Sequence, residues 1–266
     1  MMPPADGHPF AVDETRQAIA RDGDLRALRA TYAKGAYPEL PDMSSAELWD
    51  DLAGYSAVPA FRIRRLQAVA ELVASDARVL DVGVGWGEII PMLRDRGNRE
   101  YVGIDFSAKI VTALAKKYPD CRFLVGGLEQ IDEDFDVILA LEVCEHILPS
   151  KIFDFYSQIT RVLRADGRLI VTVPVYEDLR AATLRCPQCG HMHSRMGHVR
   201  SYTPELIKAE LSLAGFEVTG SFFIYTSFDN SPTGRVKRGI VDIGRRLFRL
   251  GQTQPLGLVV QARKAG

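Results

Sequence analysis

Short apolar runs alternate with amphipathic stretches along much of this 266-residue chain. Runs rich in valine, isoleucine and leucine are typical of buried strands, and stretches with apolar residues three or four positions apart are typical of helices that cover a sheet. We predict strands near 78–82, 100–104, 121–125, 135–140 and 167–173, with helices near 87–96, 107–117 and 150–164. This alternation indicates an α/β fold with a doubly wound parallel sheet.

Helical patterns also fill the part of the chain that precedes the first predicted strand. Apolar residues recur at helical spacing over 13–33, although Gly23 weakens the middle of this helix, and again over about 58–74. The sequence Ser44-Ser45-Ala46-Glu47 is a capping box, which predicts a short helix that begins there. Residues 1–75 are therefore expected to form an N-terminal helical extension.

The segment Val79-Leu80-Asp81-Val82-Gly83-Val84-Gly85-Trp86-Gly87-Glu88 carries the clearest chemical signal in the chain. An apolar strand leads to Asp81, and three glycines then alternate with other residues before a helical pattern resumes. Glycines adopt dihedral angles that are closed to other residues and let a ligand lie against the main chain, while the following helix offers unpaired N–H groups. The segment predicts a nucleotide-binding turn.

The charges around this turn favour some nucleotides over others. The dinucleotide fingerprint G-x-G-x-x-G would need its third glycine at Glu88, so a pyrophosphate would meet the carboxylates of Asp81 and Glu88. A second predicted strand ends at Asp105, whose carboxylate can accept hydrogen bonds from both ribose hydroxyls. A nucleoside with a cationic group therefore suits the site better than NAD, and an NAD-dependent oxidoreductase is the weaker alternative.

These two segments resemble the first two motifs of the class I S-adenosylmethionine (SAM) methyltransferases, in which D-x-G-x-G-x-G forms the cofactor turn. The resemblance covers 78–175 closely and 200–266 loosely. It implies a Rossmann-like sheet of seven strands, one of them antiparallel, with the last two near 217–225 and 256–262. It also implies that SAM contacts the following residues: Asp81, Gly83, Gly85, Gly87, Asp105, Phe106, Leu128 and Glu142.

The resemblance also bears on the adenine contact and on the domain boundaries. Where this family often has an aspartate for the adenine amino group, the chain has Gly127, which leaves the Leu128 backbone or Glu129 for that role. The methyltransferase domain is expected to span 76–266. In this family helices that precede the domain often form a lid over the substrate, and the alternative is that they only cover an edge of the sheet.

A further motif, Leu141-Glu142-Val143-Cys144-Glu145-His146, follows the fourth predicted strand. It resembles the E-V-x-E-H segment of methyltransferases that act on hydroxyl groups, including the ubiquinone-pathway O-methyltransferases and the 2′-O-methyltransferases of small-RNA 3′ ends. The resemblance implies that Glu145 and His146 are the catalytic residues. In the RNA enzymes both glutamates, the histidine and a later histidine hold a divalent cation, which here implies Glu142, Glu145, His146 and, as the later histidine, His198.

Without a cation, the same motif has a simpler interpretation. Glu142 then only orients the cofactor, and His146 is a base or lines the acceptor site. Because SAM already carries an activated methyl group, a base and good alignment suffice for transfer in that case.

The segment Cys186-Pro187-Gln188-Cys189-Gly190-His191-Met192-His193 resembles a zinc knuckle, in which one tight turn supplies two thiolates. Cys186, Cys189, His193 and His198 give the spacing C-x2-C-x3-H-x4-H, and His191 is an alternative ligand. We expect a structural zinc ion that pins an insertion at 175–200. The alternative is a reduced surface loop with free thiols. His198 cannot serve both metals, so one of these assignments is incomplete.

Residues 231–250 combine basic side chains with an apolar stripe at helical spacing. The stripe consists of Val236, Ile240, Ile243, Leu247 and Leu250. A basic amphipathic helix of this kind contacts anionic lipid or a phosphorylated substrate, or it packs against the protein with a solvated basic face.

Composition indicates in which compartment the protein is expected and which partners are disfavoured. The formal net charge is −1, which disfavours DNA or RNA as a general partner. No apolar run reaches the length of a membrane span, and the first residues lack the features of a signal peptide. Four cysteines without a disulfide-like pattern indicate a reducing compartment, so we expect a cytoplasmic protein.

Taken together, the motifs predict a SAM-dependent methyltransferase. The E-x-x-E-H resemblance alone favours O-methylation of a small molecule such as a sugar, a lipid-linked glycan or a secondary metabolite. The alternatives are a cation-dependent RNA 3′-end 2′-O-methyltransferase and a protein that binds SAM without transferring its methyl group. The sequence leaves the acceptor and the oligomeric state open.

Overall fold

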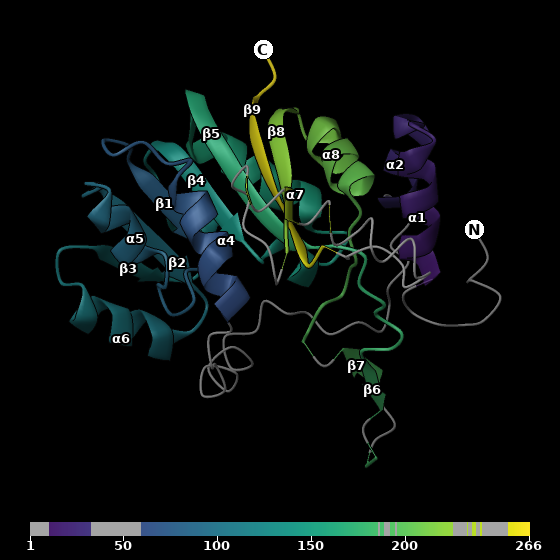
Figure 1. Ribbon diagram of the computed structural model, residues 1–266, viewed down its shortest axis with the longest axis horizontal. Helices are drawn as coiled ribbons and strands as arrows, with labels where there is room; N and C mark the ends of the chain where they lie inside the picture. Colours follow the sequence, from purple (N-terminus) through teal and green to yellow (C-terminus); the bar gives the residue numbers. More distant parts are fainter. Residues whose placement is uncertain are drawn as a thin grey trace.

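The structure is a computed structural model, and it describes residues 11–32, 60–185, 187–188, 192–194, 196–225, 233, 236–237, 240 and 255–266. The short helix predicted from the Ser44 capping box lies outside these residues, and so does most of the basic segment 231–250. Within the described part, seven strands form one sheet with helices on both faces (Figure 1).

The sheet has the strand order β3-β2-β1-β4-β5-β9-β8. Strands β1 to β5 pair in parallel, whereas β9 is antiparallel to both of its neighbours, β5 and β8. The seven strands are β1 (Val79–Val82), β2 (Tyr101–Asp105), β3 (Arg122–Val125), β4 (Phe135–Leu141), β5 (Leu163–Pro174), β8 (Phe216–Ile224) and β9 (Gly257–Lys264). The predicted Rossmann-like sheet with a single antiparallel strand is therefore confirmed.

Alternate residues of the central strands enter two hydrophobic clusters, one on each face of the sheet. Leu80 and Ile138 belong to one cluster, while their neighbours Val79 and Leu139 belong to the other. Parallel strands buried on both faces require this continuous apolar pattern, which explains why the strands were evident in the sequence.

Helices close both clusters. On one face lie α1 (Ala11–Arg21), α2 (Leu25–Tyr32), α7 (Ile152–Val162) and α8 (Pro204–Leu213), and on the other lie α4 (Ala60–Ala70), α5 (Ile90–Asp95) and α6 (Ala108–Lys117). Two 3₁₀ turns, η1 (Leu128–Gln130) and η2 (Cys144–His146), follow strands β3 and β4. No helix among the described residues is long and apolar enough to span a bilayer.

The prediction of one continuous helix over 13–33 is wrong. The structure has two helices there, because Gly23 takes the left-handed conformation with φ of 74° and ends α1. The carboxylate of Asp24 then accepts a hydrogen bond from the backbone N–H of Ala27 at 2.9 Å, which caps the start of α2.

The helices before β1 do not pack together as one structural unit. Helices α1 and α2 pack beside α8, at one side of the sheet (Figure 1). Helix α4 instead buries Leu66 and Val69 in the same cluster as β1, as the helices of the sheet domain do. The boundary predicted between 1–75 and 76–266 therefore divides a continuous core.

The insertion at 175–200 contains an antiparallel hairpin that the sequence did not predict. Strands β6 (Thr183–Arg185) and β7 (Met192–Ser194) pair with each other and project away from the large sheet (Figure 1). The C-P-x-C-G segment lies between these two strands.

Candidate functional site

The glycine turn after β1 has three left-handed residues, with φ of 70° at Gly83, 51° at Gly85 and 66° at Gly87. A Cβ atom on Gly83 would lie 2.9 Å from the Val143 side chain, and one on Gly87 would lie 2.8 Å from that of Ile90. A Cβ atom on Gly85 would meet no atom of another described residue closer than 4.0 Å, apart from its chain neighbours. Gly83 and Gly87 are therefore needed for packing, whereas Gly85 leaves its backbone open to a ligand.

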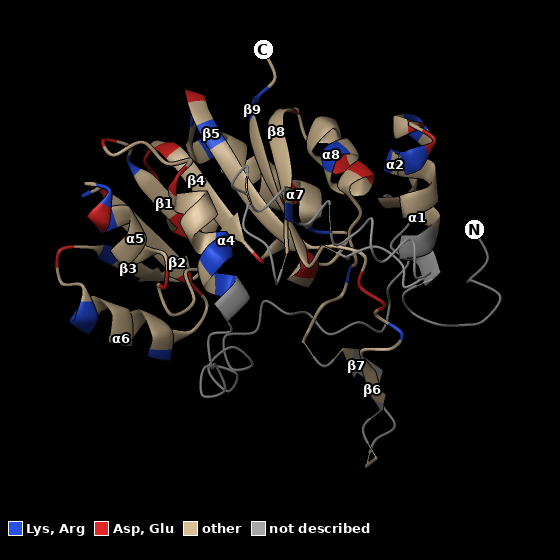
Figure 2. Ribbon diagram, viewed as in Figure 1, with Lys and Arg blue, Asp and Glu red and all other residues tan. Residues whose placement is uncertain are grey.

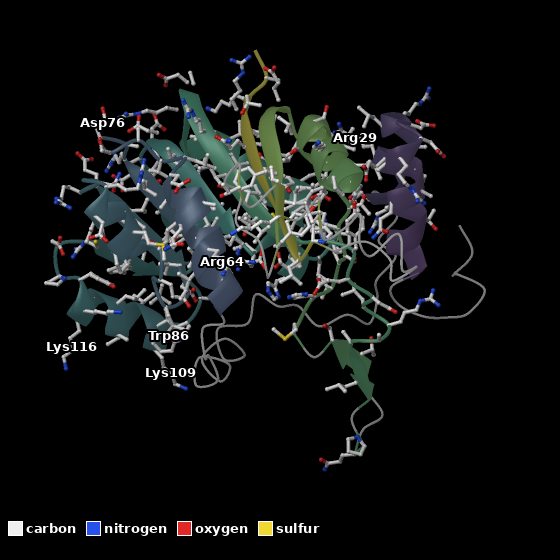
Figure 3. The ribbon with its side chains drawn as sticks, viewed as in Figure 1. Arg29, Arg64, Asp76, Trp86, Lys109 and Lys116 are labelled. Carbon is white, nitrogen blue, oxygen red and sulfur yellow. The ribbon has the colours of Figure 1, made fainter. Side chains whose placement is uncertain are left out.

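Asp105, at the end of β2, joins the two cofactor motifs. Its Oδ2 accepts a hydrogen bond from the backbone N–H of Gly85 at 3.0 Å, and its Oδ1 accepts one from the N–H of Ser107 at 2.9 Å. Ser107 in turn caps α6. Trp86 of the glycine turn and Lys109 of α6 lie at this same end of the sheet (Figure 3). The carboxylate predicted to bind ribose thus lies beside the turn predicted to bind the same nucleoside.

Asp81 lies on β1 beneath this turn and is buried. The hydroxyl of Tyr101 donates a hydrogen bond of 2.5 Å to Oδ2, while Oδ1 has no partner among the described residues. Burial raises the pKa of Asp81 to about 7, although the hydrogen bond from Tyr101 lowers it, and Asp105 and Glu88 raise it further. Three carboxylates that disfavour one another's charge would each gain from a bound cation.

The remaining predicted cofactor residues lie at the ends of β2 and β3. Phe106, directly after β2, is partly exposed, and Leu128, in η1, is buried. The Glu129 carboxylate accepts a hydrogen bond from the backbone N–H of Gly127 at 3.1 Å. Glu129 therefore caps the turn at which the adenine contact is expected.

Helix α4 supplies two arginines to this region that sequence reasoning missed. The Arg62 guanidinium lies 3.3 Å from Oε2 of Glu88, and that of Arg65 lies 2.6 Å from Oε2 of Glu142. Arg65 is buried, and its Nε has no partner among the described residues. The i, i+3 spacing of the two arginines on one helix face was the available signal.

Glu142 follows β4 with a left-handed backbone, φ 58°. Besides the ion pair of Oε2 with Arg65, Oε1 accepts a hydrogen bond of 2.9 Å from the hydroxyl of Thr172 on β5. A left-handed conformation at a non-glycine residue costs free energy and persists where its surroundings enforce it. Both oxygens of Glu142 are thus held by neighbours from α4 and β5.

Glu145, His146 and His198 form a compact group in which one ligand atom from each lies within 4.8 Å of the others. The His146 and His198 rings meet edge to face, with 4.9 Å between centroids. Three of the four residues that the E-V-x-E-H resemblance implies as cation ligands are in this group, whereas the fourth, Glu142, lies outside it and is paired with Arg65.

Hydrogen bonds orient both histidine rings through Nδ1. Nδ1 of His146 lies 3.1 Å from the carbonyl oxygen of Gly197, and Nδ1 of His198 lies 2.8 Å from Oε2 of Glu177. A carbonyl or carboxylate partner on one ring nitrogen fixes the tautomer that turns the other nitrogen toward a metal ion. Glu177 was not identified from the sequence, where no motif marks it.

The electrostatics of this group are unusual for a site without a cation. Glu145 is fully buried, and neither of its carboxylate oxygens has a hydrogen-bond partner among the described residues. Burial, and then the neighbouring Glu142, raise the pKa of Glu145 well above its usual value. Burial and then His198 lower the pKa of His146 to about 3. Burial therefore favours the protonated form of Glu145 and the neutral form of His146.

The predicted zinc ligands lie largely beyond what the structure describes. Cys186 and Cys189 are outside the described residues, and of His193 only the backbone is described, paired with Leu184 across the β6–β7 hairpin. His198 belongs instead to the group of Glu145 and His146. This position favours His191, the alternative ligand, over His198 in the zinc prediction, which stays a prediction.

Sequence comparisons match the segment that contains this site. Residues 79–167 match a family model described as a methyltransferase domain. Over 99 residues the chain is 29% identical to cyclopropane mycolic acid synthase 1 of Mycobacterium tuberculosis, a match that covers 35% of this chain and 34% of that protein. Over 105 residues it is 30% identical to an uncharacterized methyltransferase of Staphylococcus carnosus, covering 39% and 50%. The chain thus spans at most half the length of these curated relatives.

A solved structure extends the similarity of fold over nearly the whole chain. It is the 1,6-didemethyltoxoflavin-N1-methyltransferase of Burkholderia thailandensis, with bound 1,6-didemethyltoxoflavin and S-adenosylhomocysteine. The TM-score is 0.56 at 19% identity, and the alignment covers 97% of this chain and 93% of that one. At this identity the similarity establishes the fold.

Proposed function

We propose that this chain, whose residues 79–167 match a methyltransferase domain, is a class I SAM-dependent methyltransferase that transfers the methyl group of SAM to a hydroxyl oxygen of a small molecule. The single observation that carries the choice of a hydroxyl acceptor is the group of Glu145, His146 and His198. It follows β4 directly, at the edge of the parallel sheet where ligands of this architecture bind.

Several features of the turn support SAM as the cofactor. The open backbone at Gly85 lies beside the carboxylate of Asp105, an acceptor of the kind that binds ribose hydroxyls. Asp81 and Glu88 each have one carboxylate oxygen without a hydrogen-bond partner among the described residues, which suits a cationic ligand. When bound, SAM supplies a methyl group on a positively charged sulfur, so the protein needs only to align the acceptor and remove its proton.

The proton of the acceptor hydroxyl is the chemical difficulty at this site. Burial favours the protonated form of Glu145, and the pKa of His146 is lowered to about 3, which makes His146 a weak base. We therefore include a divalent cation in the proposal, held by Glu145, His146 and His198. Two imidazoles and a carboxylate suit Zn²⁺, Mn²⁺ or Fe²⁺, and such an ion would ionise Glu145 and favour deprotonation of the hydroxyl.

A second candidate function has the same cation-binding group in its favour. This is 2′-O-methylation at the 3′ end of a small RNA, because a ribose with vicinal hydroxyls can chelate a divalent ion. Binding of an RNA backbone would need a concentration of positive charge. Of the described helices, α7 and α8 carry both acidic and basic residues, whereas α4 and α6 carry only basic ones (Figure 2). Because the net charge of the chain is −1, we rank this candidate second.

The test uses the full chain with methyl-labelled SAM and two acceptor pools, a low-molecular-weight metabolite extract and short single-stranded RNAs. We expect labelled product in the first pool, loss of transfer after chelation, and recovery with Mn²⁺ or Zn²⁺. Asp105→Ala should weaken calorimetric binding of S-adenosylhomocysteine, with Lys109→Ala as the control near the same turn. Transfer to RNA alone would favour the second candidate. A chain that binds neither SAM nor its demethylated product would falsify the enzymatic proposal.

Two further proposals concern the segments beyond the site. We propose that Cys186, Cys189, His193 and His191 hold a structural zinc ion at the end of the β6–β7 hairpin, because the hairpin brings the two halves of that segment together. Metal analysis of the wild type beside the Cys186→Ser/Cys189→Ser double variant tests this, and equal zinc in both would contradict it.

The basic segment 231–250 is proposed to contact anionic lipid or a phosphorylated acceptor. Sedimentation with anionic and with neutral vesicles tests whether the segment binds anionic lipid. Competition by inorganic phosphate tests whether it binds a phosphorylated acceptor.

A cytoplasmic location also stays a proposal, which fractionation of the native cells would check.

A further inference from the structure

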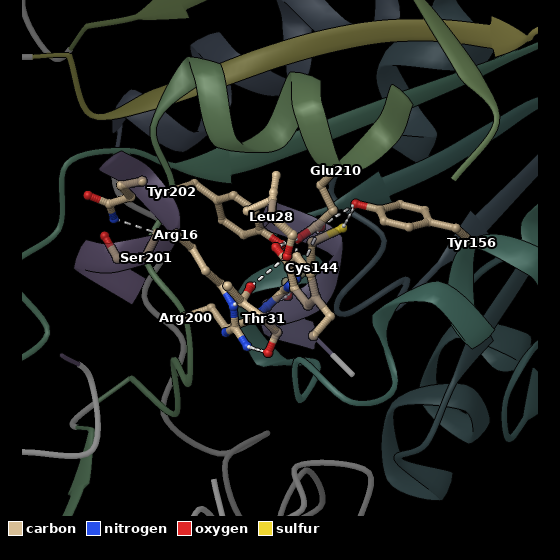
Figure 4. A network of polar contacts seen from close by, with 11 residues as sticks. Arg16, Leu28, Thr31, Cys144, Tyr156, Arg200, Ser201, Tyr202 and Glu210 are labelled. Carbon is tan, nitrogen blue, oxygen red and sulfur yellow. Dashed lines mark hydrogen bonds and ion pairs between the residues drawn. The ribbon is translucent and has the colours of Figure 1, made fainter. Parts of the chain in front are cut away.

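The buried carboxylate of Glu210 in α8 is the centre of a hydrogen-bonded cluster (Figure 4). Its oxygens accept hydrogen bonds from the hydroxyl groups of Tyr32 at 2.7 Å, Tyr156 at 3.0 Å and Tyr202 at 3.1 Å. Nη1 of Arg200 lies 2.9 Å from Oε2 and completes an ion pair. A buried carboxylate with four partners is fully satisfied, so the cluster is stable without a ligand.

Arg200 connects this cluster to the turn η2, which carries Glu145 and His146. Its Nη2 donates a hydrogen bond of 2.7 Å to the carbonyl oxygen of Cys144, the first residue of η2, and its Nε donates a longer one of 3.3 Å. The backbone N–H groups of Val199 and Arg200 donate to the carbonyl oxygen of Glu145 at 2.9 and 3.3 Å. Both the side chain and the backbone of this segment therefore hold η2.

The same segment carries His198, the third member of the site. Its other end is tied to η2 by the contact between the Gly197 carbonyl oxygen and Nδ1 of His146. Contacts of Gly197 on one side of His198, and of Val199 and Arg200 on the other, thus set the distance between His198 and Glu145. Because ligands and bases must be held within about 0.5 Å of their productive geometry, the residues that fix Arg200 also fix the site.

The N-terminal helices reach this cluster through the last turn of α2. The Arg16 guanidinium donates to Oγ1 and to the carbonyl oxygen of Thr31 at 3.0 and 3.1 Å, which fixes the turn from which Tyr32 projects. From α1, the side-chain amide of Gln17 donates to the carbonyl oxygen of Ser201 at 3.2 Å. Helix α1 therefore contacts the segment that carries His198 directly, and α2 reaches it through Tyr32 and Glu210 (Figure 4).

We infer that Glu210, Arg200 and Tyr32 are positioning residues for the group of Glu145, His146 and His198, so that the N-terminal helices support catalysis without touching the substrate. The inference rests on the proposed function. A buried ion pair contributes little net stability compared with apolar residues of similar volume. Its role here is to fix the geometry of η2, which apolar packing would define less sharply.

The test removes one hydroxyl group from the cluster and follows local hydrogen exchange. Tyr32→Phe deletes one donor to Glu210 and leaves the ion pair with Arg200 intact. Exchange is measured by mass spectrometry in the full chain for peptides that cover 142–150 and 196–203, with 79–90 as the reference. We expect exchange in the first two to accelerate about tenfold or more, because a hydrogen bond to a charged group is lost. The reference peptide and the affinity for S-adenosylhomocysteine should change less than about twofold.

Tyr118→Phe is the matched control, since Tyr118 is also buried but belongs to the hydrophobic cluster on the other face of the sheet. It should leave all three peptides unchanged. If Tyr32→Phe does not fold, Gln17→Ala gives the same comparison with a milder change. Unaltered exchange at 142–150 and 196–203, or equal acceleration in every peptide, overturns the inference.

Kinetic constants test positioning separately, because a purely structural role of Tyr32 would not lower kcat selectively. With the acceptor pool described above, Tyr32→Phe should lower kcat by about tenfold while the KM for SAM stays the same. If the proposed function is wrong, the wild type will transfer no methyl group. The hydrogen-exchange experiment does not need methyl transfer, so it still tests whether these residues position the group.

Discussion

The Arg65 guanidinium lies 2.6 Å from a carboxylate oxygen of Glu142, and this ion pair joins the helix before the sheet to the end of its fourth strand. Glu142 also has a left-handed backbone, so its side chain direction depends on the partners that hold it. The pair links α4 to a residue that is predicted to contact the cofactor, and it gives the first prediction.

Replacing Arg65 by methionine should destabilise the protein and weaken cofactor binding. The variant leaves Glu142 partly buried without its cation, which we expect to lower the free energy of unfolding by about 1–3 kcal/mol. Urea unfolding followed by circular dichroism measures this change. Arg64→Met is the matched control on the same helix, because Arg64 is exposed, and it should change the free energy of unfolding by less than about 0.5 kcal/mol. Equal losses in both variants would contradict the assignment.

Two glycines of the cofactor turn should respond differently to alanine. Gly87→Ala places a methyl group 2.8 Å from Ile90 and 2.9 Å from Leu114, so we expect a loss of about 2–4 kcal/mol in the free energy of unfolding. Gly85→Ala meets open space and should cost only about 1–2 kcal/mol for the left-handed backbone. Its methyl group should nevertheless abolish calorimetric binding of S-adenosylhomocysteine. A Gly85→Ala variant with normal affinity would contradict a ligand at this backbone.

Asp81 should make stability and cofactor affinity depend on pH in opposite directions. Its pKa is about 7 in the folded chain and 3.8 in its ordinary state, so the folded state binds more protons between these values. This contribution to stability is fully present below about pH 4 and is lost as the pH rises through 7, a change of roughly 4 kcal/mol. A bound cationic nucleoside favours the ionised form, so its affinity should rise over the same range.

The pH prediction is checked by urea unfolding and calorimetry of Asp81→Asn between pH 4 and 8. The asparagine does not titrate, so the difference in unfolding free energy between wild type and variant should follow the slope described. Asp76→Asn, at an exposed position before β1 (Figure 3), is the control and should keep the wild-type profile. Parallel profiles for wild type and Asp81→Asn would show that Asp81 does not titrate in this window.

The cation site can be tested without knowing the acceptor. Glu145→Gln should lower the affinity for Mn²⁺ by about 100-fold or more, and Glu177→Gln, which loosens His198, by about 10–100-fold. Glu142→Gln should keep the wild-type affinity, because Glu142 lies outside the group. Calorimetric titration of the chelated protein measures all three. Undiminished Mn²⁺ affinity in Glu145→Gln is the outcome that removes the cation from the proposal.

Glu145→Gln also has a stability signature. Burial, and then Glu142, raise the pKa of the Glu145 carboxyl, which favours its neutral form in the cation-free protein. Glutamine has nearly the same shape and is neutral, so the free energy of unfolding at pH 7 should change by less than about 1 kcal/mol. A large loss would mean that the ionised carboxylate is needed for the fold itself.

Much of the sheet and of the cofactor turn followed from local patterns in the sequence. Strands buried on both faces need continuous apolar runs, and the alternation of these runs with helical patterns predicted the strands to within a few residues. The left-handed backbone at Gly83, Gly85 and Gly87 is likewise a local requirement, which is why spacing alone predicted the turn. Asp105 could be placed because it ends a strand that pairs with β1.

Only the tertiary structure decided which side chains complete the site. Arg65, Glu177 and Glu210 belong to no motif, and Tyr32 meets Glu210 across 178 positions of sequence. Contacts of this kind depend on strand order, on the path of the insertion and on the docking of α1 and α2 beside α8. The same reason explains His198: its spacing from Cys189 was compatible with zinc, but the fold brings it to Glu145 and His146.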